Sequence, residues 1–264
     1  MSDLSHPRFK FMEKEVLNEA QMHARKLNAV EIGSGDGQFG NSLYRKINGK
    51  IRLFSIDPHT KPDVFAGRYR RESAEKIGLG DRSADVVFGS WFFEYLKDRA
   101  KATSEIRRIL RPGGKLVLVL HHPSAYDFRF HKKGTKSYEE YGKELERAFK
   151  LRDEKRLREI TNQETYHPGH TKENKANRDL IELLPQSIKW RGWEILVAKV
   201  LEDVERKKLA SKNTFENETQ IKQWLNRNGF EVEKISELKY IRTGDHLAFN
   251  DYGGFGIVAR KKSE

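Results

Sequence analysis

The chain has 264 residues, with 51 lysines and arginines, 39 aspartates and glutamates, and no cysteine. This length suits one large domain, or one domain with a substantial insertion. The absence of cysteine excludes a disulfide framework and a thiolate metal site. No apolar run approaches the roughly 20 residues that a membrane span requires, and residues 1–10 lack the apolar core of a signal peptide. We therefore expect a cytoplasmic protein with no membrane association.

The net charge of +12 raises the question of nucleic acid binding. The basic residues are spread along the chain and interleaved with acids, and the longest basic clusters, Arg68-Tyr69-Arg70-Arg71 and Arg206-Lys207-Lys208, are short. This distribution favours a well-solvated basic surface over a dedicated nucleic-acid face.

The first predicted element is an amphipathic helix over residues 9–26. Its buried positions recur at three- and four-residue spacing: Phe9, Met12, Val16, Ala20 and His23. We expect this helix to cover the sheet or a ligand cleft.

Residues 28–37 predict a buried strand followed by a sharp turn. Residues 29–32 are an apolar run interrupted by one acid, and glycines follow at positions 33, 35 and 37. Helical spacing of apolar residues over 39–47 then predicts a helix. A strand, a glycine turn and a helix N-terminus together can present backbone N–H groups to a ligand.

Two kinds of ligand fit this turn. Gly35-x-Gly37-x-x-Gly40 satisfies a dinucleotide pattern, which is weak evidence when it stands alone. Gly33-x-Gly35-x-Gly37, with Glu31 two residues upstream, satisfies another pattern. The carboxylate of Glu31 would repel a pyrophosphate and attract a cationic amino group.

A second buried strand is predicted over residues 51–56 and ends at Asp57-Pro58. In a parallel sheet, ligands gather outside the carboxyl ends of the strands. An aspartate there can accept hydrogen bonds from both hydroxyls of a ribose. A nicotinamide dinucleotide site would place its acid similarly, so Asp57 alone does not distinguish the two ligands.

The remaining pattern completes an alternation of strands and helices. The predicted elements are a third strand over residues 69–72, a fourth over 83–90, a helix over 98–110 with Asp98 as N-cap, and a fifth strand over 115–120.

This series resembles the class I S-adenosylmethionine-dependent methyltransferases, and most closely their broad type 11 group. The resemblance rests on the acid-apolar-G-x-G-x-G run, the aspartate that ends strand two, D-V-V in strand four and L-R-P-G-G-K-L before strand five. It covers residues 28–121 and resumes near the C-terminus, where residues 221–228 resemble the family's last helix, residues 229–232 its sixth strand and residues 256–259 its seventh. It implies an α/β fold with a Rossmann-like, seven-stranded, mostly parallel sheet whose last strand is antiparallel, formed by residues 1–123 and 214–264.

The same resemblance implies S-adenosylmethionine as cofactor, S-adenosylhomocysteine as product, and a set of contact residues. Glu31 would lie near the methionine amino group, and Asp57 would bind the ribose. The other implied contacts are the backbone of Gly33, Ser34, Gly35 and Gly37, then Pro58 near the adenine, and Ser90, Trp91 and Tyr95 around the sulfonium.

Two positions depart from the family pattern. Ser73-Ala74 stands where the family has Asp-Ala, so the adenine contact would fall to Ser73, Glu72 or Glu75. Glu94-Tyr95 stands where the family often has Glu-His.

Residues 124–213 form an insertion after strand five, where the family has a far shorter segment. Ser137-x-x-Glu140 is a capping box that begins one helix, and Pro185 precedes a second, longer amphipathic helix with Trp193, Leu196, Val197, Val200, Leu201 and Val204 on one face. We expect this helical insertion to cover the methyl-acceptor site; a dimerisation arm is the alternative.

Candidate catalytic residues lie at the end of strand five. His121 and His122 are positioned to act as a base if the methyl acceptor arrives protonated, and alternate strand residues face opposite ways, so at most one should point into the cleft. Tyr95 and Tyr126 are weaker candidates. His167-Pro168-Gly169-His170 has the spacing of metal ligands but no carboxylate or cysteine nearby in the sequence, so we predict no metal site. Asp245 and His246 lie in a loop between the last two strands that could reach the cleft.

Three functions are consistent with these observations. The favoured one is methyl transfer to a small-molecule acceptor by in-line displacement. The alternatives are an RNA methyltransferase that uses the basic surface, and a non-catalytic cofactor-binding protein of the same fold. The sequence does not identify the acceptor or the oligomeric state.

Overall fold

The computed structural model describes residues 4, 6–47, 49–59, 66–122, 137–162, 176–238 and 254–263. The chain divides into two compact units. The core unit consists of Met1–Pro123, Asn213–Thr243 and Asp251–Glu264, and the helical unit of Ser124–Lys212 and Gly244–Asn250.

Within the described residues, seven strands of the core unit form one sheet in the order β3-β2-β1-β4-β5-β7-β6. The strands are β1 (Leu27–Ile32), β2 (Ile51–Ile56), β3 (Arg68–Arg70), β4 (Ala84–Ser90), β5 (Leu110–His121), β6 (Phe230–Leu238) and β7 (Gly254–Lys261). Strands β1 to β5 pair in parallel, and β7 runs antiparallel to both β5 and β6. The predicted fold class is therefore confirmed.

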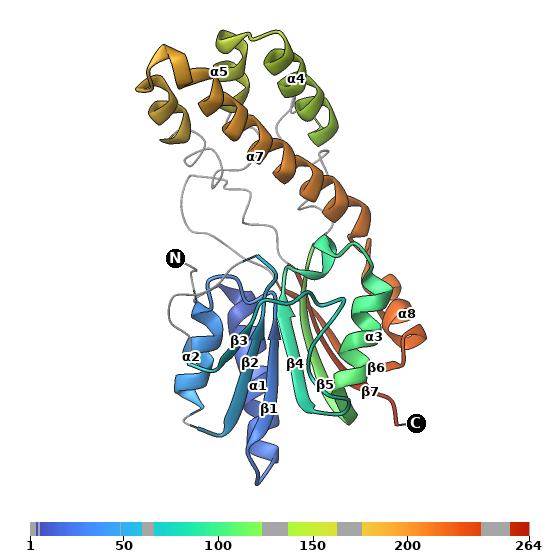
Figure 1. Cartoon of the computed structure of the whole chain (residues 1–264). Coiled ribbons are helices and arrows are strands. Elements are labelled where there is room, and N and C mark those ends of the chain that lie inside the picture. Colours follow the sequence, from blue (N-terminus) through green and yellow to red (C-terminus); the bar gives the residue numbers. More distant parts are fainter. Residues whose placement is uncertain are drawn as a thin grey trace. The chain divides into compact units, whose positions relative to one another are not determined.

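Helices cover both faces of this sheet (Figure 1). On one face, α1 (Pro7–Met22) and α2 (Gln38–Lys46) bury Phe9, Val16 and Leu43 in an apolar cluster with the strands. On the other face, α3 (Arg99–Ile109) and α8 (Glu218–Arg227) bury Ile106 and Leu225. Because both faces are covered, the central strands are almost continuously apolar, as expected for parallel strands.

Several element boundaries differ from those that the sequence predicted. Helix α1 begins at Pro7, whose missing N–H suits a first turn, and ends at Met22 instead of residue 26. The third strand is Arg68–Arg70 instead of residues 69–72. Strand β5 begins at Leu110, because Leu110 already pairs with Ala84 before the register shifts along β4.

A buried ionic cluster holds α1 against the sheet. Glu19 accepts from both ends of the Arg260 guanidinium, at 3.0 and 2.9 Å, and lies 3.1 Å from Lys115 Nζ. Burial alone would raise the pKa of Glu19, but the hydrogen bonds from Arg260 and Lys115 lower it to about 2. The carboxylate is therefore ionised at neutral pH and links α1 to β5 and β7.

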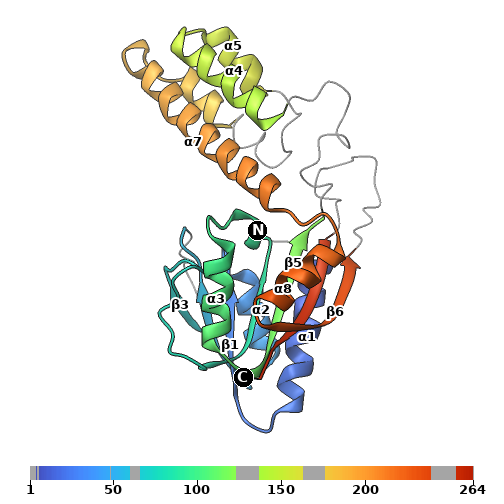
Figure 2. The same cartoon turned by 90° about the vertical axis from the view of Figure 1, so that its right-hand side faces the viewer.

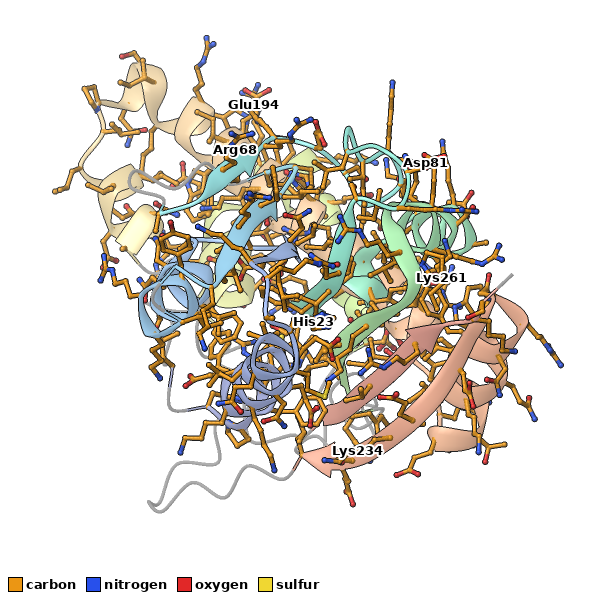
Figure 3. The ribbon with its side chains drawn as sticks, turned by 90° about the horizontal axis from the view of Figure 1, so that it is seen from below. His23, Arg68, Asp81, Glu194, Lys234 and Lys261 are labelled. Carbon is orange, nitrogen blue, oxygen red and sulfur yellow. The ribbon has the colours of Figure 1, made fainter. Side chains whose placement is uncertain are left out.

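Two further side chains near these acids are labelled in Figure 3. His23 directly follows α1, and Lys234 belongs to β6. His23 Nε2 is 3.2 Å from Glu19 Oε1, and Lys234 Nζ is 3.7 Å from Glu15 Oε1. Side chains of β5, β6 and β7, together with His23, thus surround Glu15 and Glu19 of α1.

The helical unit has a core of its own, formed by α4 (Tyr138–Lys150), α5 (Glu154–Asn162), residues 176–182 and α7 (Gln186–Asn213), as Figure 2 shows. Leu145, Leu157, Trp193 and Val197 are buried in it. The capping box at Ser137 and Glu140 is present, and Pro185 directly precedes α7. The sequence analysis did not anticipate α5. In the part of the chain that the structure describes, no helix is long and apolar enough to cross a membrane.

Candidate active site

The predicted site residues meet at one edge of the sheet because β1, β2, β4 and β5 are parallel and end there (Figure 1). Strand β1 ends next to Gly33, β2 next to Asp57, β4 at Ser90 and β5 at His121. These four points lie far apart in the sequence, and the parallel sheet alone brings them together.

The glycine turn after β1 uses its three glycines in different ways. All three have positive φ angles, which L side chains rarely adopt: 70° at Gly33, 53° at Gly35 and 73° at Gly37. A Cβ on Gly33 would lie 2.6 Å from Cβ of Phe92, whereas a Cβ on Gly35 would meet nothing within 4 Å. Gly33 therefore serves close packing, and Gly35 presents bare backbone to open space.

Gly40, the last glycine of the dinucleotide pattern, has a packing role. A Cβ at this position would lie 2.3 Å from Glu31 Oε2. The glycine lets α2 approach the buried carboxylate of β1. The match to Gly35-x-Gly37-x-x-Gly40 thus has a structural explanation that involves no phosphate.

Glu31 is a buried acid at the base of the site. Its side chain is almost fully enclosed, and Oε2 accepts a hydrogen bond from Ser55 Oγ at 2.8 Å. Burial raises the pKa of Glu31 from 4.5 to about 7, and the nearby charges of Asp36 and Asp57 act in the same direction. Such a carboxylate is stabilised by any cation that enters the site.

Asp57 fixes the turn from the neighbouring strand. Its Oδ2 accepts from the Gly35 N–H at 3.0 Å and its Oδ1 from the His59 N–H at 2.9 Å. These two backbone contacts orient the Asp57 carboxylate at the end of β2.

A pocket of about 230 Å³ lies between α1, the glycine turn and the end of β4. Arg8, Phe9 and Met12 line it from α1, and Glu31 lines it from β1. Gly89, Ser90 and Trp91 close it on the β4 side. This volume is smaller than a typical ligand pocket of roughly 300–1,000 Å³, so it suits one part of a nucleoside cofactor. Asp57 lies beside the lining residues, at the end of β2.

Buried polar atoms without a hydrogen-bond partner gather around this pocket. Among the described residues, these include Ser34 Oγ, Trp91 Nε1 and Arg8 Nε. Buried polar groups in native structures are normally satisfied. The bare backbone at Gly35, the buried acid and these unpartnered atoms therefore fit a polar, partly cationic ligand such as S-adenosylmethionine.

Trp91 connects the pocket to the end of β5. Its φ is 54°, a strained value for a residue other than glycine, and its N–H donates to the Val119 carbonyl at 2.9 Å. The indole stacks on His121 with ring centroids 4.6 Å apart and planes 19° apart. Tyr95 meets the same imidazole edge-on at 6.4 Å.

The two histidines that end β5 lie in different surroundings. Glu94 Oε1 accepts from the backbone N–H of His121 at 2.6 Å and is 3.4 Å from its Nδ1. His122 instead packs against Phe255 of β7, with ring centroids 5.5 Å apart. The expected alternation therefore brings His121, and not His122, against the aromatic residues of the pocket.

The predicted adenine contacts lie away from the pocket lining. Ser73 Oγ accepts from the Glu75 N–H, and Ala74 is buried in the core. Glu72 accepts from the Gly78 N–H and Glu75 from the Asp98 N–H, both at 2.8 Å. Pro58 is exposed next to Asp57.

The sequence did not predict the roles of two residues of the site. Arg8 lines the pocket, and Glu94 contacts His121. Both depend on contacts between distant parts of the chain and carry no spacing signal. Tyr126, His167, His170, Asp245 and His246 lie outside the described residues.

Residues 30–118 match the family model described as a methyltransferase domain. This part of the chain is a methyltransferase domain of that family. S-Adenosylmethionine is the cofactor of the family, as the resemblance predicted.

Two curated relatives agree with this assignment. Dimethylglycine N-methyltransferase of Parasynechococcus marenigrum is 31% identical over 33% of this chain and 35% of its own. A probable S-adenosylmethionine-dependent methyltransferase of Mycolicibacterium smegmatis is 30% identical over 47% of this chain and 49% of its own. The methyltransferase domain thus spans between a third and a half of these relatives.

One similar solved structure is that of the CurJ carbon methyltransferase. It shares 16% sequence identity with this chain, and the TM-score is 0.53. The alignment covers 98% of this chain and 54% of the other. At this identity the likeness concerns the fold alone.

The pH dependence of stability tests the buried state of Glu31. In the unfolded chain the Glu31 carboxyl group loses its proton near pH 4.5. In the folded, ligand-free protein the same group retains its proton up to about pH 7. The free energy of unfolding should therefore fall as pH rises from 4.5 to 7, by about 3 kcal/mol for this group. Glu31→Gln keeps the shape and removes the charge, so denaturant unfolding of the variant should lack this fall. Glu13→Gln on the surface of α1 is the control; identical profiles for wild type and Glu31→Gln would contradict the assignment.

Proposed function

We propose that the protein transfers the methyl group of S-adenosylmethionine to a small-molecule acceptor by in-line displacement. The observation that carries the proposal is the pocket in which a buried carboxylate, bare glycine backbone and unpartnered polar atoms face the same space. The methyltransferase domain over residues 30–118 supports the same chemistry.

The proposed roles of the cofactor residues are those that the resemblance to the family implies. Glu31 would hold the amino group of the methionine part, above the backbone of Gly33, Ser34, Gly35 and Gly37. Asp57 would accept from the ribose hydroxyls, with Pro58, Ser73 and Ala74 on the adenine side and Ser90, Trp91 and Tyr95 on the sulfonium side.

S-Adenosylmethionine supplies an electrophilic methyl group on a positively charged sulfur. The protein's residues have to align the acceptor with that methyl group and exclude water. His121 is the favoured base for an acceptor that arrives protonated, because it ends β5 at the site and Glu94 lies beside its Nδ1, where a carboxylate stabilises the protonated ring.

A small-molecule acceptor is favoured over RNA for two reasons. One relative with a defined activity is a dimethylglycine N-methyltransferase, which acts on a small molecule. In addition, several basic residues of the core unit are engaged with acids, including Arg25, Arg108, Arg111 and Arg260, so they do not form a dedicated phosphate-binding stripe.

The helical insertion would cover the acceptor. Its two attachment points in the core unit support this role. The chain leaves the core after His121, and it returns at Asn213, whose side chain donates to the carbonyl oxygens of Glu94 and Leu96 at 2.9 Å. Both points belong to the edge of the sheet that carries the candidate site.

Transfer of a labelled methyl group from S-adenosylmethionine tests the activity. The acceptor panel should contain small amines, carboxylic acids and phenols, with total RNA as the competing class. Labelling of a small molecule is the expected outcome. Labelling of RNA alone would overturn the acceptor class, and tight S-adenosylhomocysteine binding without any transfer would indicate a non-catalytic protein.

Asp57→Ala tests the ribose contact. Losing two hydrogen bonds to a charged group should weaken S-adenosylhomocysteine binding by about 2–4 kcal/mol, or roughly 30- to 1,000-fold. Calorimetry should show a similar loss for 5′-methylthioadenosine, which also carries the ribose. Asp81→Ala, on the exposed loop before β4, is the matched control. An unchanged dissociation constant in folded Asp57→Ala would remove this residue from the site.

Paired histidine variants test the base. With an acceptor that needs deprotonation, His121→Gln should lower kcat by about 100-fold or more, because the proton acceptor is lost. His122→Gln should change kcat less than about threefold, since this ring packs on Phe255. Binding of S-adenosylhomocysteine should be retained in both variants. Equal rates for His121→Gln and wild type would show that the acceptor arrives unprotonated or that another group accepts the proton.

Replacing residues 126–212 by a short Gly/Ser linker tests the role of the insertion. Cofactor affinity should persist, because every proposed cofactor contact lies outside the replaced segment. Methyl transfer should be lost, since acceptor alignment provides most of the catalysis. Full turnover in a folded deletion variant would assign the insertion to assembly instead.

A further inference from the structure

We propose that Arg8, on the N-terminal helix, binds the carboxylate of the cofactor's amino-acid part. The inference rests on the proposed use of S-adenosylmethionine and adds a residue that lies outside the methyltransferase motif. It would make α1 a functional wall of the site in addition to a cover for the sheet.

The geometry of Arg8 is that of a stacked, oriented guanidinium. Its Cζ lies 3.5 Å from the ring centroid of Trp91 and 4.3 Å from that of Phe9. Trp91, Phe9 and Arg8 all line the same pocket. Stacking on aromatic faces fixes the plane of a guanidinium and leaves its N–H edge for a planar anion, which a carboxylate can meet with two parallel hydrogen bonds.

Arg8 is also a partly buried cation in the pocket, with Asp36 as the nearby anion. Burial lowers the pKa of Arg8 to about 10, partly opposed by the charge of Asp36, so the guanidinium stays protonated at neutral pH. Its Nε is buried without a hydrogen-bond partner, and among the described residues its guanidinium forms no ion pair. Removing a charge from water is costly unless an opposite charge compensates it.

Other arginines of the core unit show the contrast. Arg260 holds Glu19 through two nitrogens, and Arg25 holds Asp85 in the same way. Arg108 is paired with Glu105 and Asp81. Arg8, by contrast, is partly buried and lines the pocket.

The charges of the pocket match a zwitterion. The carboxyl groups of Glu31 and Asp36 and the guanidinium of Arg8 line it. An α-amino acid group carries an ammonium and a carboxylate on the same carbon. Its ammonium would favour the ionised form of Glu31 and its carboxylate would compensate the charge of Arg8, whereas an uncharged ligand would do neither.

The test is calorimetry on the full chain with two ligands that differ only in the carboxylate. S-Adenosylhomocysteine carries it, and 5′-deoxy-5′-(3-aminopropylthio)adenosine retains the amine without it. Arg8→Met should weaken binding of the first ligand by about 10- to 100-fold and change binding of the second by less than about threefold. Arg8→Lys should recover part of the loss, because it restores the charge without the planar fork.

Lys10→Met is the matched control, since it removes an exposed positive charge from the same helix. It should leave both affinities unchanged, and thermal unfolding of the ligand-free variants should confirm that α1 is intact. Equal losses for both ligands would overturn the proposal, because Arg8 would then act only by holding Trp91. No loss for either would overturn it as well. If the wild type binds neither ligand, the proposed cofactor use fails first and Arg8's role with it.

Discussion

The burial of one carboxylate, that of Glu31, constrains the rest of the site. Burial raises its pKa to about 7, and the Ser55 hydroxyl of the neighbouring strand donates to it. The helix that follows the glycine turn has to pass so close that residue 40 must be a glycine. A protein that keeps an acid in this position destabilises its ligand-free state above neutral pH. The natural explanation is a cationic ligand that recovers this free energy on binding.

Helix α1 links this site, at one end of the strands, to the opposite end of the same strands. At its C-terminal half, Glu19 is clamped by Arg260 and Lys115, where a broken pair would leave buried charge uncompensated. At its N-terminal end, it presents Arg8 and Phe9 to the pocket. The ionic cluster thus sets the register of the helix on the sheet, and that register determines which side chain reaches the pocket.

Trp91 joins the pocket to the end of β5. It contacts Arg8 on the pocket side and stacks on His121 at the end of β5. Its positive φ is a strained conformation, and the hydrogen bond to Val119 helps to hold it. Strain of this kind is found at sites where a side chain must be aimed in one direction. Glu94 accepts a hydrogen bond from the backbone N–H of His121 and lies 3.4 Å from its Nδ1. It therefore orients both the backbone and the ring of His121.

Local chemistry in the sequence determined the order of strands and helices, the glycine turn and the acid that ends β2, because these features depend on period, turn residues and short spacing. It also determined the presence of a helical insertion, through the capping box at Ser137 and the apolar stripe that contains Trp193. It did not determine why Gly40 is a glycine, which of the two histidines ending β5 joins the pocket, or that Arg8 faces it. Those facts arise from contacts between residues far apart in the chain, and only the packing of α1, β4 and β5 against one another decides them.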